Sequence, residues 1–112
     1  MQVKGWHVAR EGEAVTLARR CPARFDLKVE TLLPPVGRLD RLAHQVRQDM
    51  WRALRDLRGF APVVRVTPCE GGVTVEAGGE VAGAVPRQAV EARIADVLED
   101  RANRARWVNW AA

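Results

Sequence analysis

The stretch RFDLKVETLLPPVGRLDRLAHQVRQDMWRALRDLR, residues 24–58, decides the fold because its hydrophobic period changes once along its length. In its first part, every second residue from Phe25 to Val29 is apolar and the residues between them are charged. This period of two predicts a strand over 24–32 with one face on a core and the other in water. The prolines at 34–35 end the strand, because neither can donate a hydrogen bond to a neighbouring strand.

The second part of the stretch, from about Arg38 to Arg58, predicts an amphipathic helix. Apolar residues recur there at spacings of three and four, namely Leu39, Leu42, Ala43, Val46, Met50, Ala53, Leu54 and Leu57. At about 100° per residue these positions share one side of a helix, which we expect to lie on the core. Gly59 is placed to end the helix, since glycine is common directly after a helix C-terminus.

Two hairpins are predicted on either side of this helix. GWHVAR (5–10) and AVTLAR (14–19) flank the short turn EGE, and APVVRV (61–66) and GVTVEA (72–77) flank the turn TPCEGG. The glycine-rich segment GGEVAGAV that follows either continues the last strand or forms a loop.

The C-terminal third predicts a second helix and a short third one. The second helix follows Pro86 and has an apolar side made of Val90, Ile94, Val97 and Leu98. It is expected to end near Asp100, whose side chain can cap a short final helix that carries Trp107 and Trp110.

Residues 1–112 are therefore expected to form a single α+β domain. The predicted order is βββ-α-ββ-α plus a short C-terminal helix. Since both main helices are apolar on one side only, we expect two layers, an antiparallel sheet of about five strands with the two main helices packed on one face.

The charge of the chain favours an anionic partner without requiring one. The net charge is +4, and apart from Lys4 and Lys28 every basic residue other than histidine is arginine. Arginine pairs well with carboxylates and phosphates, although a GC-rich genome or a need for solubility gives the same bias. No apolar run is long enough for a membrane span or a secretion signal, so we expect a cytoplasmic protein with Cys21 and Cys69 reduced.

Trp51 lies on the charged side of the predicted central helix, close to His44. Arg47, Trp51 and Arg55 are spaced i, i+4 and i+8, so they are expected to form a ladder of stacked side chains along one face. Two explanations require no partner: the arginines stack on the indole for their own stability, or a terminus of the same molecule covers Trp51.

The functional interpretation is a surface that binds a protein partner or a second copy of the chain, because tryptophan and arginine dominate the energetics of protein interfaces. The residues expected to make this surface are Arg47, Trp51, Arg55 and Arg58, with Trp107 and Trp110 from the C-terminal tail. The alternative is single-stranded nucleic acid, whose bases would stack on Trp51 while arginines bind phosphates. Both tail tryptophans can also be core residues.

Catalytic constellations are not evident in the sequence. Asp40 and His44 are spaced for a pair on one helix side, but no third metal ligand accompanies them, and no histidine is placed in sequence to activate Cys69. We therefore expect a non-enzymatic interaction protein or accessory subunit that uses no metal and no cofactor.

Overall fold

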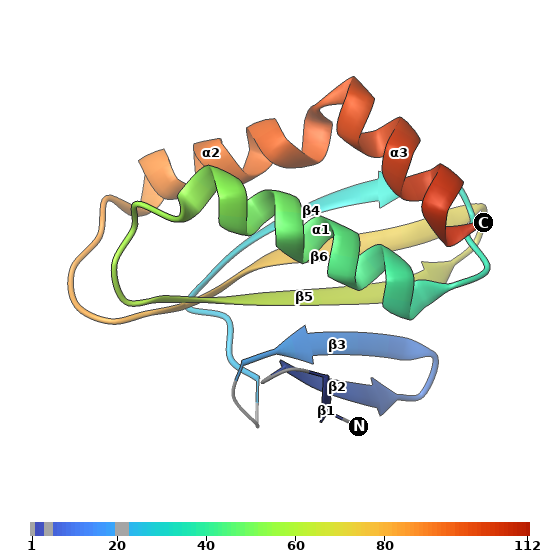
Figure 1. The fold of residues 1–112 in the computed structure, drawn as a ribbon, viewed down its shortest axis with the longest axis horizontal. Coiled ribbons are helices and arrows are strands. Elements are labelled where there is room, and N and C mark those ends of the chain that lie inside the picture. The colour runs from blue at the N-terminus through green and yellow to red at the C-terminus, as the bar shows by residue number, and fades with distance from the viewer. Residues whose placement is uncertain (1, 4–5, 20–22) are drawn as a thin grey trace.

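The structure is a computed structural model that describes residues 2–3, 6–19 and 23–112. Within these residues the elements are β1 (Gln2–Val3), β2 (Trp6–Glu11), β3 (Ala14–Ala18), β4 (Leu27–Leu33), α1 (Leu39–Leu54), β5 (Phe60–Cys69), β6 (Gly72–Val81), α2 (Arg87–Glu99) and α3 (Arg101–Ala111) (Figure 1). The strands form one antiparallel sheet in the order β1-β2-β3-β5-β6-β4. The predicted α+β class and element order are confirmed, with the two-residue β1 as an additional edge strand.

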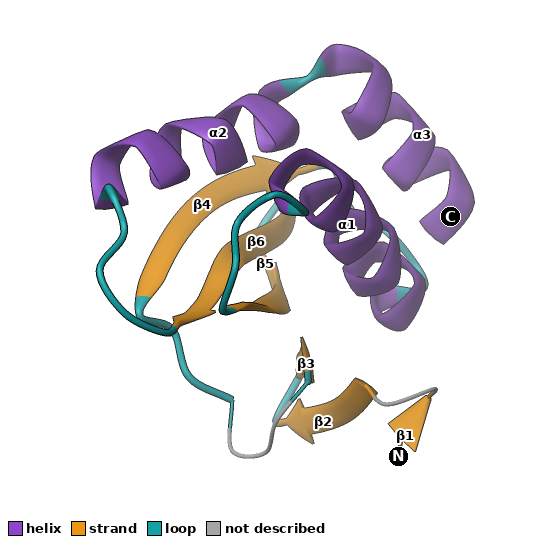
Figure 2. Cartoon of the chain, turned by 60° about the vertical axis from the view of Figure 1, so that its left-hand side comes forward, coloured by secondary structure: helices purple, strands orange, loops and turns teal. Residues whose placement is uncertain are grey.

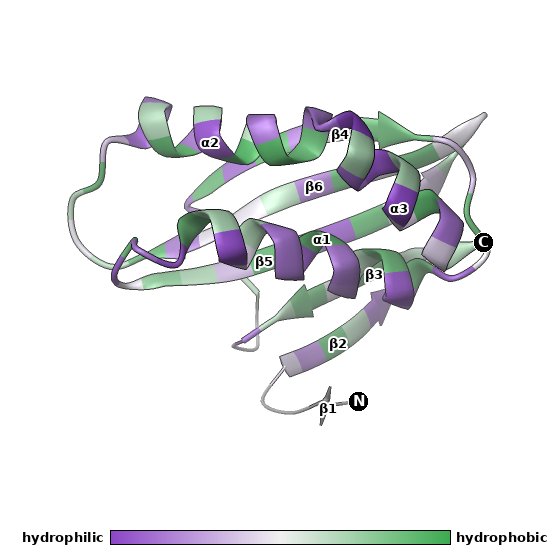
Figure 3. Ribbon diagram, turned by 45° about the horizontal axis from the view of Figure 1, so that its top comes forward, coloured by the Kyte–Doolittle hydropathy of each residue, from purple (hydrophilic) through white to green (hydrophobic). Residues whose placement is uncertain are grey.

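The three helices lie on one face of the sheet (Figure 2). Each helix carries both hydrophilic and hydrophobic residues, as Figure 3 shows, so it can bury one side and leave the other in water. Helix α1 packs on β5 and β3 and is flanked by α2 and α3. This arrangement leaves one flank of α1 facing α2 and α3 and the opposite flank facing the β2–β3 hairpin.

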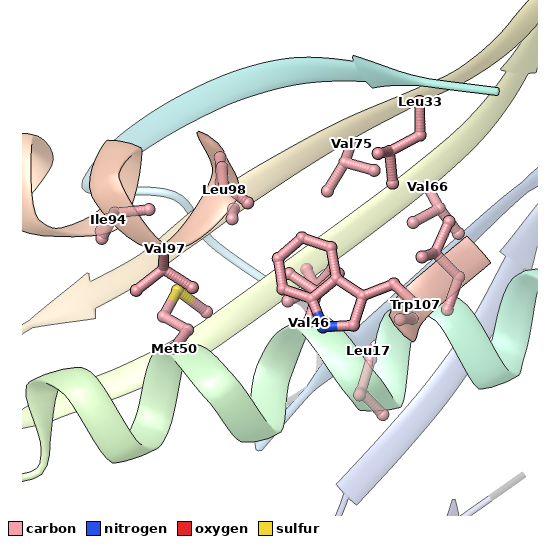
Figure 4. Packing of buried hydrophobic residues seen from close by; sticks show 14 of the residues in the cluster. Leu17, Leu33, Val46, Met50, Val66, Val75, Ile94, Val97, Leu98 and Trp107 are labelled. Atoms are coloured by element: carbon pink, nitrogen blue, oxygen red, sulfur yellow. The ribbon is translucent and has the colours of Figure 1, made fainter. Parts of the chain in front are cut away.

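Strand register selects the residues that meet the helices. Leu17 pairs with Val64 and Val64 with Ala77, so these side chains share the sheet face under the helices. They join a core whose largest fully buried side chains include Leu42, Met50, Ile94 and Leu98 from the helices (Figure 4).

The opposite sheet face is polar near its centre. Lys28 on β4 bonds Glu76 on β6 at 2.8 Å, and Arg65 on β5 lies 3.8 Å from the same carboxylate. Arg65 also donates to Thr16 at 3.2 Å. The strand predicted for 24–32 is Leu27–Leu33 in the structure, so the predicted alternation holds only from Leu27. Phe25 precedes the strand, and its ring contacts Lys28 and Arg65 of the charged face instead of the core.

Helix α1 ends at Leu54, about one turn before the predicted end at Arg58. The cause is a long-range contact: Arg93 of α2 donates to the Ala53 carbonyl and, at 2.7 Å, to the Asp56 carboxylate. Because the Ala53 carbonyl has this partner, the Leu57 amide donates to Leu54 instead, which tightens the chain into a turn. Gly59 follows with a φ of 74°, a left-handed conformation that suits glycine.

The glycine-rich segment continues β6 as far as Val81, which decides the alternative that the sequence left open. A Cβ on Gly78 would lie 2.0 Å from the Leu27 carbonyl oxygen, and one on Gly79 would lie 2.1 Å from that of Ala61. Glycine is therefore needed here for close backbone approach within the sheet rather than for a loop.

The C-terminal region forms the predicted helices. Helix α2 ends at Glu99, and the Asp100 carboxylate accepts a hydrogen bond of 2.8 Å from the Asn103 amide, which caps α3. In the described part of the chain, no helix is both long enough and apolar enough to cross a membrane.

Candidate functional site

Trp51 is an exposed residue on the outer side of α1. Its side chain is 46% exposed, so among the described residues neither the N-terminal hairpin nor the C-terminal helix covers it. Within the described part of the chain, the explanation that a terminus of the same molecule buries Trp51 is therefore wrong. A large apolar side chain left in water is a notable feature on a small domain.

The predicted ladder of Arg47, Trp51 and Arg55 does not form. The guanidinium of Arg47 lies over the ring of Trp6 on β2, with its carbon 4.7 Å from the ring centroid. Among the described residues, the cation–π contacts involve the rings of Trp6, Phe25 and Trp110 and none involves Trp51. The spacing was correct, but a side chain from another element attracted Arg47 away from Trp51.

Arg55 and Arg58 lie in the turn that follows the last residue of α1, and both are exposed. Within the described residues neither makes a salt bridge or a side-chain hydrogen bond. We call the surface made by Trp51, Arg55 and Arg58 the Trp51 face. Its two arginines remain available to a partner.

The aspartates of this region face the other flank of α1. Asp49 has a side chain only 11% exposed and bonds Arg106 of α3, and Asp56 bonds Arg93 of α2. The structure uses these carboxylates to hold α2 and α3, so they do not neutralise the Trp51 face.

Trp107 is a core residue, so the core alternative offered by the sequence is confirmed for it and its assignment to a partner-binding surface is wrong. Its side chain is fully buried, and its Nε1–H donates to Asp49 at 2.6 Å. Figure 4 shows the indole directed from α3 toward α1, close to Val46. Trp107 therefore docks α3 on α1 and presents no surface to another molecule in this structure.

Trp110 is 55% exposed and lies beside the N-terminal half of α1. Its ring centroid is 5.9 Å from the Arg41 guanidinium carbon. Together with Asp40, His44 and Gln45, these two side chains line a hollow of about 310 Å³. His44 lies two helical turns before Trp51, so the exposed tryptophans are near opposite ends of the outer side of α1.

Burial also affects His44. It lowers the pKa of the imidazole from its ordinary value of 6.5, the positive charge of Arg47 lowers the pKa further, and Asp40 opposes both effects. The neutral imidazole is thus the favoured form at neutral pH.

Trp6 and Arg19 are the side chains that reasoning from sequence missed. Arg19 follows β3, and its guanidinium carbon lies 4.7 Å from the Trp6 ring centroid, as that of Arg47 does. The signal was present in the hairpin register: His7 pairs with Ala18, and continuing that register by one residue brings Trp6 opposite Arg19. The contribution of Arg47 from α1 could not be read from that register.

The chemistry of the remaining residues is limited. Cys69 is exposed and accepts a 3.6 Å hydrogen bond from Thr74, while Cys21 lies outside the described residues. Over residues 6–19 and 23–112, no three side chains of the histidine, cysteine, aspartate or glutamate type lie together in a way that could hold a metal ion.

Comparisons of the chain with protein-family models, with curated protein sequences and with solved structures gave no match, so the geometry of the fold and of the Trp51 face carries the functional argument.

Proposed function

We propose that the protein is a non-enzymatic interaction protein of the cytoplasm that binds a protein partner through the Trp51 face. The observation that carries the proposal is an indole 46% exposed on α1, followed along the chain by two exposed arginines that lack acidic partners in the described part of the chain. Tryptophan and arginine are the residues whose truncation most often weakens a protein interface by about 2 kcal/mol or more.

The chemistry of the face indicates the chemistry of its partner. Arg55 and Arg58 are complementary to carboxylates, and Trp51 fits an apolar pocket. A second copy of the chain is the weaker candidate for this face, because a two-fold contact would bring the same arginines against each other. We therefore infer an acidic surface on a different protein, with an apolar pocket at its centre.

Single-stranded nucleic acid is the second candidate. It is favoured by one observation, the engagement of Asp49 and Asp56 with α3 and α2, which leaves the outer side of α1 more basic than its sequence suggests. It ranks below a protein partner because the Trp51 face holds a single indole, whereas strand-binding surfaces commonly stack several successive bases on aromatic rings.

The test is affinity capture from cells of the source organism, with quantitative comparison of variants. Trp51→Ala and the double variant Arg55→Glu, Arg58→Glu should each lose the same captured protein. The matched controls are Leu32→Ala, which removes a side chain 56% exposed on β4, and Arg101→Glu at the start of α3. Binding of the captured protein, purified, must then repeat this pattern.

Nucleic acid is tested in parallel with labelled single-stranded and double-stranded oligonucleotides of mixed sequence at about 50 and about 200 mM salt. Binding that falls steeply with salt and is lost in Trp51→Ala would replace the protein partner by nucleic acid. Equal capture by the α1 variants and the controls would overturn the proposal.

A further inference from the structure

Two arginines from different elements share one tryptophan ring in the space between α1 and the N-terminal hairpin. The guanidinium carbons of Arg19 and Arg47 each lie 4.7 Å from the centroid of the Trp6 ring. Trp6 is only 6% exposed, so the ring is held in place and gives both guanidiniums a fixed contact. We call Arg19 and Arg47 the arginine pair.

Among the described residues, the arginine pair has no carboxylate partner. Within the described residues, no aspartate or glutamate forms a salt bridge with either member, whereas Arg24, Arg65, Arg93, Arg104 and Arg106 each have a carboxylate within 4 Å. Burial lowers the pKa of Arg47, and the neighbouring charge of Arg19 lowers it further. The folded chain thus holds the guanidinium of Arg47 near a second positive charge.

Arg47 also has an unmet hydrogen bond. Its Nε is buried and has no acceptor among the described residues. A buried donor without an acceptor destabilises a fold, so such a group calls for an acceptor that a bound ligand can supply. Arg19 is exposed, which gives a ligand access to the pair from solvent.

We infer that the arginine pair on Trp6 is a binding site for the phosphate group of a phosphomonoester. A guanidinium stacked on a ring keeps its in-plane N–H donors free, and two of them offer more donors than the two oxygens of one carboxylate can accept. A phosphomonoester supplies three oxygens and nearly two negative charges, which balance both arginines. Because Trp6 holds the guanidiniums before binding, little order has to be created when the ligand arrives.

This site is separate from the Trp51 face and does not depend on the proposed protein partner. Arg47 is directed to Trp6 rather than to Trp51, and in the described part of the chain the cations over the Trp6 ring are Arg19 and Arg47, not Arg55 or Arg58. Variants can therefore remove one site and leave the other.

The test follows the indole Nε1–H signal of Trp6 by NMR while inorganic phosphate is added at constant ionic strength. We expect a saturable shift with phosphate that chloride does not give. Arg19→Gln should weaken phosphate affinity by about tenfold or more, since it removes charge-assisted hydrogen bonds at an exposed position where folding is not at risk. Arg47→Lys keeps the charge of the buried member but loses its planar donors, and it should weaken affinity similarly.

Two control variants keep the result specific. Arg101→Gln removes an exposed arginine of α3, and Trp51→Ala removes the centre of the Trp51 face, so both should bind phosphate like the unmodified protein. A phosphoserine peptide and a nucleoside monophosphate, each compared with its unphosphorylated form, distinguish a protein source of the phosphate from a small-molecule source. Tighter binding of either phosphorylated form supports the site. A response equal to that of chloride, or one unchanged in Arg19→Gln and Arg47→Lys, would overturn it.

Discussion

Trp107 combines a large apolar surface with one hydrogen bond, and both contribute to holding α3 on α1. The ring fills the space between α1 and the sheet, and its Nε1–H is satisfied by Asp49. A buried indole requires such an acceptor, which explains why Asp49 lies on the flank of α1 that faces α3. Trp110, three residues later, leaves most of its ring in water.

These two tryptophans should differ strongly in their effect on stability. Trp107→Ala should lower the free energy of unfolding by about 3–5 kcal/mol, because it opens a cavity and removes the hydrogen bond from the indole to Asp49. Trp110→Ala should lower it by less than about 1 kcal/mol. Urea denaturation followed by circular dichroism measures both. Similar losses for the two variants would contradict the assignment of Trp107 to the core.

His44 should make stability depend on pH in a defined window. Its pKa is lowered by burial in the folded state, so below about pH 6.5 the unfolded chain binds a proton more readily than the folded one. The contribution of His44 to stability is therefore present above pH 6.5 and is lost as pH falls through the folded-state pKa. The pKa values of the Asp26 and Asp56 carboxyls are lowered from 3.8 by hydrogen bonds from Arg24 and Arg93, so their effects begin at lower pH.

The measurement is the free energy of unfolding of the unmodified protein and of His44→Gln at pH 7.5, 6.5 and 5.5, three values chosen to span about one unit on either side of the ordinary histidine pKa. The unmodified protein should lose stability toward pH 5.5, and His44→Gln should lose less. Equal slopes would show that the imidazole titrates alike in both states.

At the scale of elements, the sequence correctly predicted each helix or strand that has a clear hydrophobic period of its own. The alternation before Pro34 and the spacing of three and four after Arg38 identified β4 and α1. The end of α1 could not be predicted, because the group that competes for the Ala53 carbonyl is Arg93, 40 positions further along the chain. The course of β6 through Gly78 and Gly79 also depends on distant residues, because carbonyl oxygens of β4 and β5 lie where side chains at these positions would be.

The sequence predicted only part of the candidate site, because the rest depends on contacts between elements. Helical spacing placed Trp51 on the polar side of α1, and the structure leaves its ring exposed. The direction of the Arg47 side chain depends on Trp6, which belongs to a strand, and the burial of Trp107 depends on Asp49. A period describes one element at a time, so contacts between elements lie outside what it can predict.

Gly78 gives a test of the close approach between β6 and β4. Gly78→Ala would place a Cβ 2.0 Å from the Leu27 carbonyl oxygen, and a backbone atom cannot move aside as a flexible side chain would. We expect it to lower the free energy of unfolding by about 3 kcal/mol or more, at the upper end of overpacking effects. In the control Gly37→Ala, the new Cβ would be 3.7 Å from Ala112, and stability should change by less than about 1 kcal/mol. Thermal or urea unfolding compares the two, and equal effects would contradict the register of β6 with β4.

At the scale of the whole molecule, charge is divided between the two flanks of α1. Toward α2 and α3 the carboxylates of Asp49 and Asp56 are bonded to arginines, so that flank is electrically balanced and serves the fold. Toward the N-terminal hairpin and the solvent, Arg19, Arg47, Arg55 and Arg58 have no acidic partner in the described residues, whereas the exposed Arg52 lies 3.6 Å from Asp49. A fold that satisfies its charges on one side and leaves them unsatisfied on the other is expected where a partner supplies the missing charge.

The most direct test of the central claim, that the Trp51 face binds a protein, is photo-crosslinking in cells. A photoreactive amino acid replaces Gln48, which lies on α1 one turn before Arg52 and close to Trp51, and in a second variant it replaces Leu32 on β4 as the control. We predict one defined protein adduct at position 48 that is absent at position 32 and is lost when Arg55→Glu and Arg58→Glu are added. The absence of an adduct at position 48, or the same adducts at positions 48 and 32, would contradict the claim.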